Sequence, residues 1–189
     1  NLMGDHENVG ALDEVNGNDV LIGMFYGKGG TDMHPLVALD VAGHEYSHMV
    51  VSRNGNGGLD YENESGALNE SFADIFGTSI EFYVNDNPNW TIGEGVLKNN
   101  VMPNYLRSMS DPNNTPTSVG APNQPDTYKG NYWQNTTTNP NGFNDYGGVH
   151  INSGVGNHWF YLLSVGGSGV NDIGDNYYVN GITIQKAEK

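Results

Sequence analysis

The sequence predicts a mainly α-helical protein with a short β segment near its N-terminus. Residues 36–53 and 65–84 carry apolar side chains at helical spacing, and a third helical stretch begins at residue 147. One run rich in aliphatic and aromatic residues, 19–26, favours a strand. Segments rich in glycine, asparagine and proline separate these elements and indicate where each one ends.

The N-terminal region contains little that could form a sheet around its one strand. Residues 1–35 are rich in Gly, Asn and Asp, and the strand at 19–26 runs into the glycine-rich residues 27–30. A lone strand cannot bury its faces, so it needs partners that we do not find in this part of the sequence.

The first predicted helix carries a metal-binding pattern. It spans residues 36–53, and a glycine- and asparagine-rich turn at 54–58 ends it. His44 and His48 are four residues apart, so both project from one helical face and can bind one metal ion. Glu45 lies beside the first histidine, where it can take a proton from water at the ion. The same five-residue pattern also occurs on helices whose histidines are merely packed or solvated, so a metal site requires a further ligand elsewhere in the sequence.

A third metal ligand should come from the second predicted helix. Catalytic zinc takes three protein ligands and keeps one open position. One class uses a glycine and a third histidine after the pair, but Val51 and Asn54 occupy those positions. The helix at 65–84 and the residue just before it contain three glutamates, Glu64, Glu70 and Glu81. Asp74 lies one turn beyond Glu70 on the same face, where a carboxylate could orient a zinc-bound histidine.

The composition narrows the possible partners. The 189 residues include no cysteine, and 22 acidic residues against 7 Lys and Arg give a formal net charge of −15. Any metal must therefore be bound by His, Asp and Glu. Such a charge repels nucleic acid and anionic membranes, and it suits calcium binding or plain solubility. No apolar run of about 18 residues is present. The acidic, Asn-, Gly- and Tyr-rich composition resembles that of secreted bacterial enzymes.

The second half of the sequence is less regular. Residues 89–147 are rich in Pro, Asn and Thr, but their aromatic residues favour a packed surface loop over disorder. The segment from Gly147 to Gly154 opens the third helix, which ends at a glycine-rich stretch from residue 166. Residues 181–189 are typical of the first turns of a fourth helix.

Four blocks in order resemble the thermolysin-like neutral metalloproteases. They are His44-Glu45-x-x-His48, Asn63-Glu64-Ser65-Gly66-Ala67-x-Asn69-Glu70-x-x-x-Asp74-Ile75-Phe76-Gly77, Leu106-Arg107-Ser108-Met109-Ser110-Asp111-Pro112 and Gly147-Gly148-Val149-His150-x-Asn152-Ser153-Gly154. The resemblance implies an α+β zincin whose helical zinc-binding lobe, residues 36–189, follows a remnant of a β-rich lobe, residues 1–35. It also implies that the C-terminal helices of this lobe are missing, so we expect a fragment of a full catalytic domain.

The resemblance assigns roles to individual residues. It implies that one catalytic zinc ion is bound by His44, His48 and Glu70. Glu45 corresponds to the general base, and Asp74 to the carboxylate that supports His44. His150 corresponds to the histidine that stabilises the tetrahedral intermediate or donates a proton, oriented by Asp145, and Tyr61 to the tyrosine that hydrogen-bonds the oxyanion. The residues expected around the pocket just past the scissile bond are Arg107, Val41, Ile92 and Leu106.

The resemblance also implies calcium near the zinc site. The matching positions are Asp40, Glu81, Glu94, Asn87, Asn89 and Thr91. Asn89 and Thr91 each stand where the family has a carboxylate. Calcium prefers several charged oxygen ligands, so we expect one structural calcium ion rather than two.

The expected function is that of a secreted zinc metalloendopeptidase acting on polypeptides as a monomer. It should prefer a bulky hydrophobic residue on the new amino side of the cleaved bond. A zinc aminopeptidase is one alternative, but no clear Gly-x-Met-Glu-Asn motif precedes the metal helix. A catalytically impaired metal-binding pseudoprotease is another, because the β-rich lobe is short, although Glu45, Tyr61 and His150 argue against it.

Overall fold

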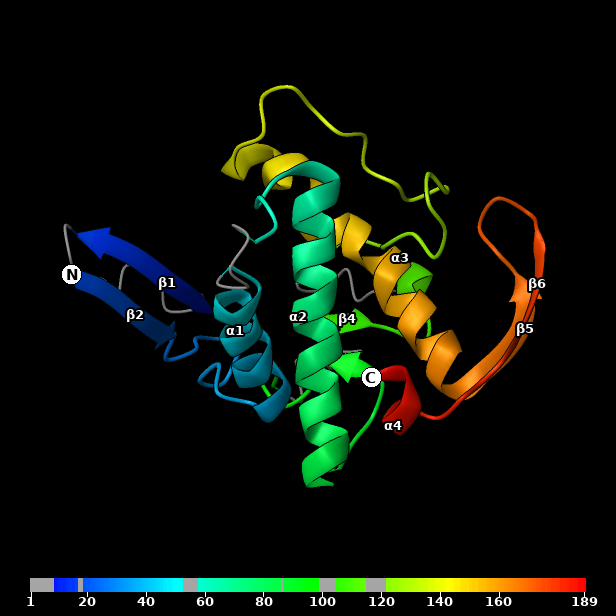
Figure 1. Cartoon of the computed structure of the whole chain (residues 1–189), viewed down its shortest axis with the longest axis horizontal. Coiled ribbons are helices and arrows are strands. Elements are labelled where there is room, and N and C mark those ends of the chain that lie inside the picture. The colour runs from blue at the N-terminus through cyan, green and yellow to red at the C-terminus, as the bar shows by residue number, and fades with distance from the viewer. Residues whose placement is uncertain (1–8, 17–18, 53–57, 86, 99–104, 115–121) are drawn as a thin grey trace.

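Three helices form the body of the protein, as the sequence predicts. The computed structural model describes residues 9–16, 19–52, 58–85, 87–98, 105–114 and 122–189. Helix α2 (Asn63–Val84) lies between α1 (Leu39–Ser52) and α3 (Asp145–Val165) and packs against both (Figure 1). The predicted turn at 54–58 and the last residue of the predicted first helix lie outside the described residues, apart from Gly58.

Helices α1 and α2 approach closely because each has a glycine at the crossing. A Cβ atom on Gly77 would clash with the backbone carbonyl oxygen of Asp40. A Cβ on Gly43 would lie 2.9 Å from the Ile80 side chain and 3.1 Å from Gly77 Cα. The absence of both side chains lets the two backbones approach, and this places the histidine face of α1 against α2.

Helix α3 starts with a kink that the sequence explains. Asn144 caps it by accepting a hydrogen bond from the Gly147 backbone N–H at 3.2 Å. Gly147 and Gly148 both have φ near +85°, a left-handed conformation that glycine adopts at little cost. The preceding single-turn helix, Gly142–Asn144, is capped by Asn141. The chain therefore turns sharply just before His150.

Two β-hairpins flank the helices at opposite ends of the molecule (Figure 1). Strand β2 (Asp19–Tyr26) confirms the predicted strand, and it pairs antiparallel with β1 (Val9–Asn16). Strands β5 (Gly166–Val170) and β6 (Asn176–Asn180) form the second hairpin beyond α3. We did not predict β1, β5 or β6, because glycine, acidic residues and asparagine dilute their β signals.

Short elements complete the core and place Arg107. Strands β3 (Thr91–Ile92) and β4 (Arg107–Ser108) pair antiparallel, and a single-turn helix follows at Pro112–Asn114. Helix α4 (Ile184–Ala187) confirms a helical turn in the last predicted segment. Its Ile184 is buried in a cluster with Ile75, Ile92, Met109 and Phe160. None of the helices in the described part of the chain is long and apolar enough to cross a membrane.

Candidate metal centre

Two histidines from α1 and a glutamate from α2 meet in one place. His44 and His48 lie on successive turns, and their Nε2 atoms are 2.9 Å apart. Each Nε2 lies 3.4 Å from an oxygen of Glu70, with His44 facing Oε2 and His48 facing Oε1. One ligand atom from each of the three residues lies within 4.8 Å of the others. This is the set that the sequence predicted as zinc ligands.

The hydrogen bonds of the two histidines leave their Nε2 atoms available for a metal ion. His44 Nδ1 lies 2.8 Å from Asp74 Oδ1, and His48 Nδ1 lies 2.7 Å from Asn69 Oδ1. Both partners are acceptors, so each Nδ1 carries the proton and each neutral ring presents a lone pair at Nε2. Glu70 Oε2 is buried and has no hydrogen-bond partner among the described residues. Three electron-pair donors therefore face one another, as a zinc ion with two imidazole ligands and one carboxylate ligand requires.

Two buried carboxylates give the centre its negative charge. Burial alone would raise the pKa of Glu70, but His150, His44 and His48 outweigh it when they are protonated and lower that pKa. Burial would also raise the pKa of Asp74, yet Arg107 and the hydrogen bond from His44 hold it far below its usual range. For His44, burial would lower the pKa, but Asp74 and Glu70 raise it. The cluster thus favours a bound cation, whether a proton or a metal ion.

Glu45 differs from the other carboxylates of the centre. It is 6% exposed and follows His44 on α1. Burial is the largest influence on its pKa and raises it, the neighbouring Glu70 adds to this, and His44 and His48 oppose it. A carboxylate with a raised pKa accepts a proton more readily at neutral pH, which suits a general base.

Tyr61 and His150 face the same centre from the other side. The Tyr61 hydroxyl donates to Glu70 and lies 3.2 Å from His150 Nε2. His150 Nδ1 lies 2.5 Å from Asp145 Oδ1, and the His150 backbone N–H donates to Asp145 Oδ2 at 2.9 Å. Burial and Glu70 raise the pKa of Tyr61, so its hydroxyl stays protonated. Partial desolvation would lower the pKa of His150, whose side chain is 47% exposed, but Glu70 and Asp145 raise it.

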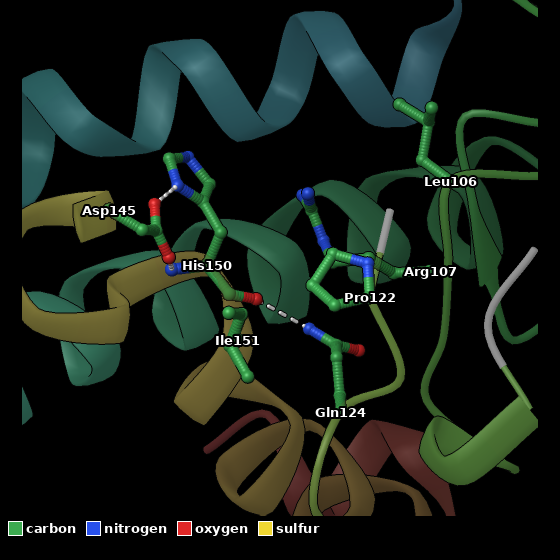
Figure 2. Close-up of a pocket in the computed structure, with 7 residues that line it drawn as sticks. All are labelled: Leu106, Arg107, Pro122, Gln124, Asp145, His150 and Ile151. Atoms are coloured by element: carbon green, nitrogen blue, oxygen red, sulfur yellow. Dashed lines mark hydrogen bonds and ion pairs between the residues drawn. The ribbon is translucent and has the colours of Figure 1, made fainter. Parts of the chain in front are cut away.

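A cavity of about 250 Å³ opens beside His150 and Arg107. Figure 2 shows Asp145 and His150 on one side of it and Leu106 on the other. The remaining lining residues are Pro122, Gln124 and Ile151. Val41 and Ile92, which we expected around the substrate pocket with Leu106, do not line this cavity. Val41 is buried in a core cluster with Leu36, Val96 and Leu97. Ile92 is buried in another core cluster with Met109 and Phe160.

Arg107 is held by the metal centre itself. Its Nε and Nη2 donate to the two oxygens of Asp74 at 2.8 and 2.6 Å. This leaves Nη1 as the guanidinium nitrogen that Asp74 does not engage. Burial would lower the pKa of Arg107, but the charge of Asp74 raises it. Arg107 therefore joins the cavity wall to the carboxylate behind His44.

Three residues of the site had not been anticipated. Asn69 accepts from His48, and Asn157 donates to Asp74 at 2.7 Å. Gln124 donates to the His150 carbonyl oxygen at 2.7 Å, as Figure 2 shows. Asn69 precedes Glu70 on α2, so its position relative to the glutamate was a usable signal. The other two lie far from the motif along the chain, and only the fold brings them to it.

A second carboxylate group lies near the first. Oxygens of Asp40, Glu81 and Glu94 lie within 4.8 Å of one another. Asp40 Oδ1 is buried without a hydrogen-bond partner among the described residues, and burial and Glu94 raise the pKa of this carboxyl group despite a hydrogen bond from the Gly93 N–H.

The uncharged residues expected at this second group contact it through hydrogen bonds. The side chains of Asn89 and Thr91 both hydrogen-bond to Glu94, at 2.5 and 3.0 Å, and Asn89 Oδ1 accepts from Thr91. Asn87 takes part through its backbone carbonyl oxygen, which accepts from Asn89 at 3.3 Å. The three acidic residues therefore form the group, and Asn89 and Thr91 hold one of them in place.

Family profiles and related sequences both match this chain to metalloproteinases. The profile of the thermolysin metallopeptidase α-helical domain matches residues 57–189, and that of the thermolysin metallopeptidase catalytic domain matches residues 15–52. Bacillolysin from Bacillus caldolyticus is 46% identical over 146 residues, or 76% of this chain and 24% of the relative. A zinc metalloproteinase from Renibacterium salmoninarum is 41% identical over 169 residues, or 87% of this chain and 26% of the relative.

A solved structure agrees with these matches. The precursor of protealysin, a metalloproteinase from Serratia proteamaculans, superimposes with a TM-score of 0.61 at 38% identity. The match covers 74% of this chain and 43% of the protealysin precursor. The chain thus spans about a quarter of the length of the curated relatives that it matches.

Replacing Asp74 by Asn should destabilise the metal-free protein. The change leaves the mostly buried Arg107 charge without its partner, and breaking a buried pair costs about 3–5 kcal/mol. Because folding lowers the pKa of Asp74, its contribution to stability is present above the unfolded pKa of about 3.9 and is lost as the pH falls below it. Urea unfolding should therefore show a large gap between the two proteins at pH 7 that narrows below about pH 4.

The matched control is Asp111→Asn, a change at an exposed carboxylate. It should alter the free energy of unfolding by no more than about 0.5 kcal/mol. Equal stability of wild type and Asp74→Asn at pH 7 would contradict the proposed role of the Asp74–Arg107 pair.

Proposed function

Because this chain belongs to the thermolysin metallopeptidase family, we propose that it carries the catalytic centre of a zinc metalloendopeptidase. One observation supports this most strongly. His44 Nε2, His48 Nε2 and Glu70 converge on one point, Glu45 lies on the α1 side of it, and Tyr61 and His150 lie on the other. The site therefore has a place for a Lewis acid, a base beside it and two hydrogen-bond donors opposite.

Glu45 is proposed as the general base. A zinc ion held by His44, His48 and Glu70 would polarise the substrate carbonyl group and lower the pKa of water at the site. Glu45 then takes a proton from the attacking water and passes it to the leaving amine. Its burial supports this role, because a carboxylate whose pKa is raised toward the working pH both accepts and returns a proton readily.

Tyr61 and His150 are proposed to stabilise the oxyanion that forms during attack. The Tyr61 hydroxyl and His150 Nε2 lie 3.2 Å apart and face Glu70, so both can point at an oxygen near the metal site. Asp145 holds His150 Nδ1 and thereby directs Nε2 inward. Hydrogen-bond donors in such positions typically contribute about 2.7–4 kcal/mol each to transition-state stabilisation.

We also propose a substrate preference and a cellular setting for the protein. Leu106 and the aliphatic Ile151 line the cavity beside Arg107, which supports a preference for a bulky hydrophobic residue on the new amino side. The cysteine-free, acidic composition supports secretion from a bacterial cell and gives no reason to expect nucleic acid as a partner. We propose that the protein acts on polypeptides as a monomer.

Glu45→Gln tests the proposed mechanism. The amide cannot accept the proton, so kcat on a peptide with a central Leu or Phe should fall by about 10²–10⁴-fold. Zinc content should remain at one ion per chain, because Glu45 is not among the ligands. Activity is followed by chromatography of the cleaved peptide, and zinc by elemental analysis of the same samples. A zinc-loaded Glu45→Gln protein as active as wild type would refute the mechanism, and zinc-loaded wild type without activity would favour the pseudoprotease.

We further propose one structural calcium ion at Asp40, Glu81 and Glu94. Three carboxylates supply the hard, charged oxygen ligands that calcium prefers. Burial and the charge of Glu94 both raise the pKa of Asp40, and a bound cation would offset them by favouring the ionised carboxylate.

Calcium should raise the melting temperature of the wild type and leave that of Asp40→Asn unchanged. At a calcium concentration of 100 times Kd, binding adds about 2.7 kcal/mol to the free energy of unfolding. Without calcium, Asp40→Asn should be no less stable than wild type, because it removes a buried charge that Glu94 repels. Asp175→Asn, at an exposed carboxylate, is the control and should respond to calcium as wild type does. Melting of the wild type that is independent of calcium would exclude the site.

A further inference from the structure

A buried amide of α3 contacts the carboxylate behind the metal centre. Asn157 is completely buried, and its Nδ2 donates to Asp74 Oδ2 at 2.7 Å. Its side-chain oxygen Oδ1 is buried without a hydrogen-bond partner among the described residues. The amide is therefore placed for the one hydrogen bond that it gives to Asp74.

This hydrogen bond completes the environment of Asp74. One oxygen, Oδ1, accepts from His44 Nδ1 at 2.8 Å and from Arg107 Nη2 at 2.6 Å. The other, Oδ2, accepts from Arg107 Nε at 2.8 Å and from Asn157. A carboxylate has about four lone-pair positions, so all of them are used. Arg107 comes from β4, His44 from α1 and Asn157 from α3, and each element thus fixes the carboxylate from a different direction.

The close contact between α2 and α3 positions the amide. A Cβ atom on Gly156 would clash with the Ser71 hydroxyl and lie 3.0 Å from Ser71 Cβ, so glycine at this position favours a close approach of the two helices. Asn157 follows Gly156 on α3, and Asp74 lies one turn beyond Ser71 on α2. The approach therefore brings the amide and the carboxylate within hydrogen-bond distance.

We propose that Asn157 is a positioning residue for the metal centre and acts through Asp74 on His44. Its hydrogen bond stops the Asp74 carboxylate from turning about its Cβ–Cγ bond, so that Oδ1 remains on His44 Nδ1. The imidazole then keeps its Nδ1-protonated form and its direction, with Nε2 toward Glu70. This role rests on the proposed zinc centre, in which support of a ligand histidine affects metal affinity by about 10–100-fold.

A neutral donor is required at this position. The negative charge of Asp74 is already paired with Arg107 and shared with His44. A cationic side chain at position 157 would add a buried charge without a partner, and an anionic side chain would repel Asp74. The ionised state of Asp74 also fixes the orientation of the amide, because only the NH2 group can face a carboxylate. An apolar residue of similar size would fill the space and leave one lone pair of a buried carboxylate without a partner.

The test compares Asn157→Leu with Asn152→Leu in the full chain. Asn152 is a matched control, since it is also a buried asparagine on α3 but bonds to Gln134 rather than to the metal centre. Zinc affinity is measured by competition with a chromophoric chelator, and thermal melting of the zinc-free proteins gives their stability. Both variants should melt at lower temperature than wild type. Only Asn157→Leu should lose zinc affinity, by about 10–100-fold. Unchanged affinity, or an equal loss in Asn152→Leu, would overturn the proposal.

A second readout does not depend on zinc. In the metal-free wild type, NMR should show a downfield, slowly exchanging Nδ1 proton on His44, and in Asn157→Leu this proton should exchange faster. If the His44 proton exchanges faster in Asn157→Leu than in wild type but wild type binds no zinc, the proposed function fails and the positioning role stands. If wild type binds zinc and the proton is unaffected by Asn157→Leu, the positioning role fails alone. Should Asn157→Leu not fold, Asn157→Ser replaces it, with a shorter donor and a smaller expected loss of affinity; wild-type affinity in that variant would overturn the proposal.

Discussion

The metal centre depends on one buried carboxylate that must remain ionised. Asp74 is fully buried on α2, and an isolated charge in such a place would be costly. Arg107, His44 and Asn157 offset this cost with four hydrogen bonds, and together they draw β4, α1 and α3 onto α2. The same bonds set the proton of His44 on Nδ1. The contacts that hold the three helices together therefore also orient a metal ligand.

The balance of charge explains why the centre is built for a cation. Glu70 and Asp74 are both buried and ionised, and the positive charge of Arg107, whose side chain is 15% exposed, is paired with Asp74. The remaining negative charge of Glu70 faces two neutral imidazole nitrogens and the Tyr61 hydroxyl. A divalent ion would satisfy these groups together. Glu45 lies beside this charge, and the raised pKa that burial gives it suits a carboxylate that exchanges a proton.

Local patterns in the sequence were sufficient for the helices and for much of the site. The histidines of α1 are four residues apart, and so are Glu70 and Asp74 on α2, so helical geometry alone places each pair on one face. The strand at 19–26 was equally clear from its composition. Its partner β1 and the hairpin of β5 and β6 were missed, because their residues have weak strand propensity and their pairing is decided by neighbours.

Contacts between distant segments could not be predicted in the same way. Asn157 is 83 residues from Asp74, and its role depends on a close helix crossing at Gly156. Val41 and Ile92, expected around the substrate pocket, are buried in core clusters, and Leu106 packs against the cluster that contains Val41. Tyr61, His150 and Asp145 were placed by resemblance to a family, and the structure brings them together opposite α1.

X-ray absorption at the zinc edge tests the central claim most directly, since it reports the ligands of the ion in solution. The zinc-loaded protein should hold one ion per chain, with two imidazole nitrogens at about 2.0–2.1 Å and the other ligands oxygen. Replacing His48 by Ala should remove one imidazole from the spectrum. A shell of oxygen alone, or a spectrum unchanged in the His48→Ala protein, would contradict a centre built from His44, His48 and Glu70.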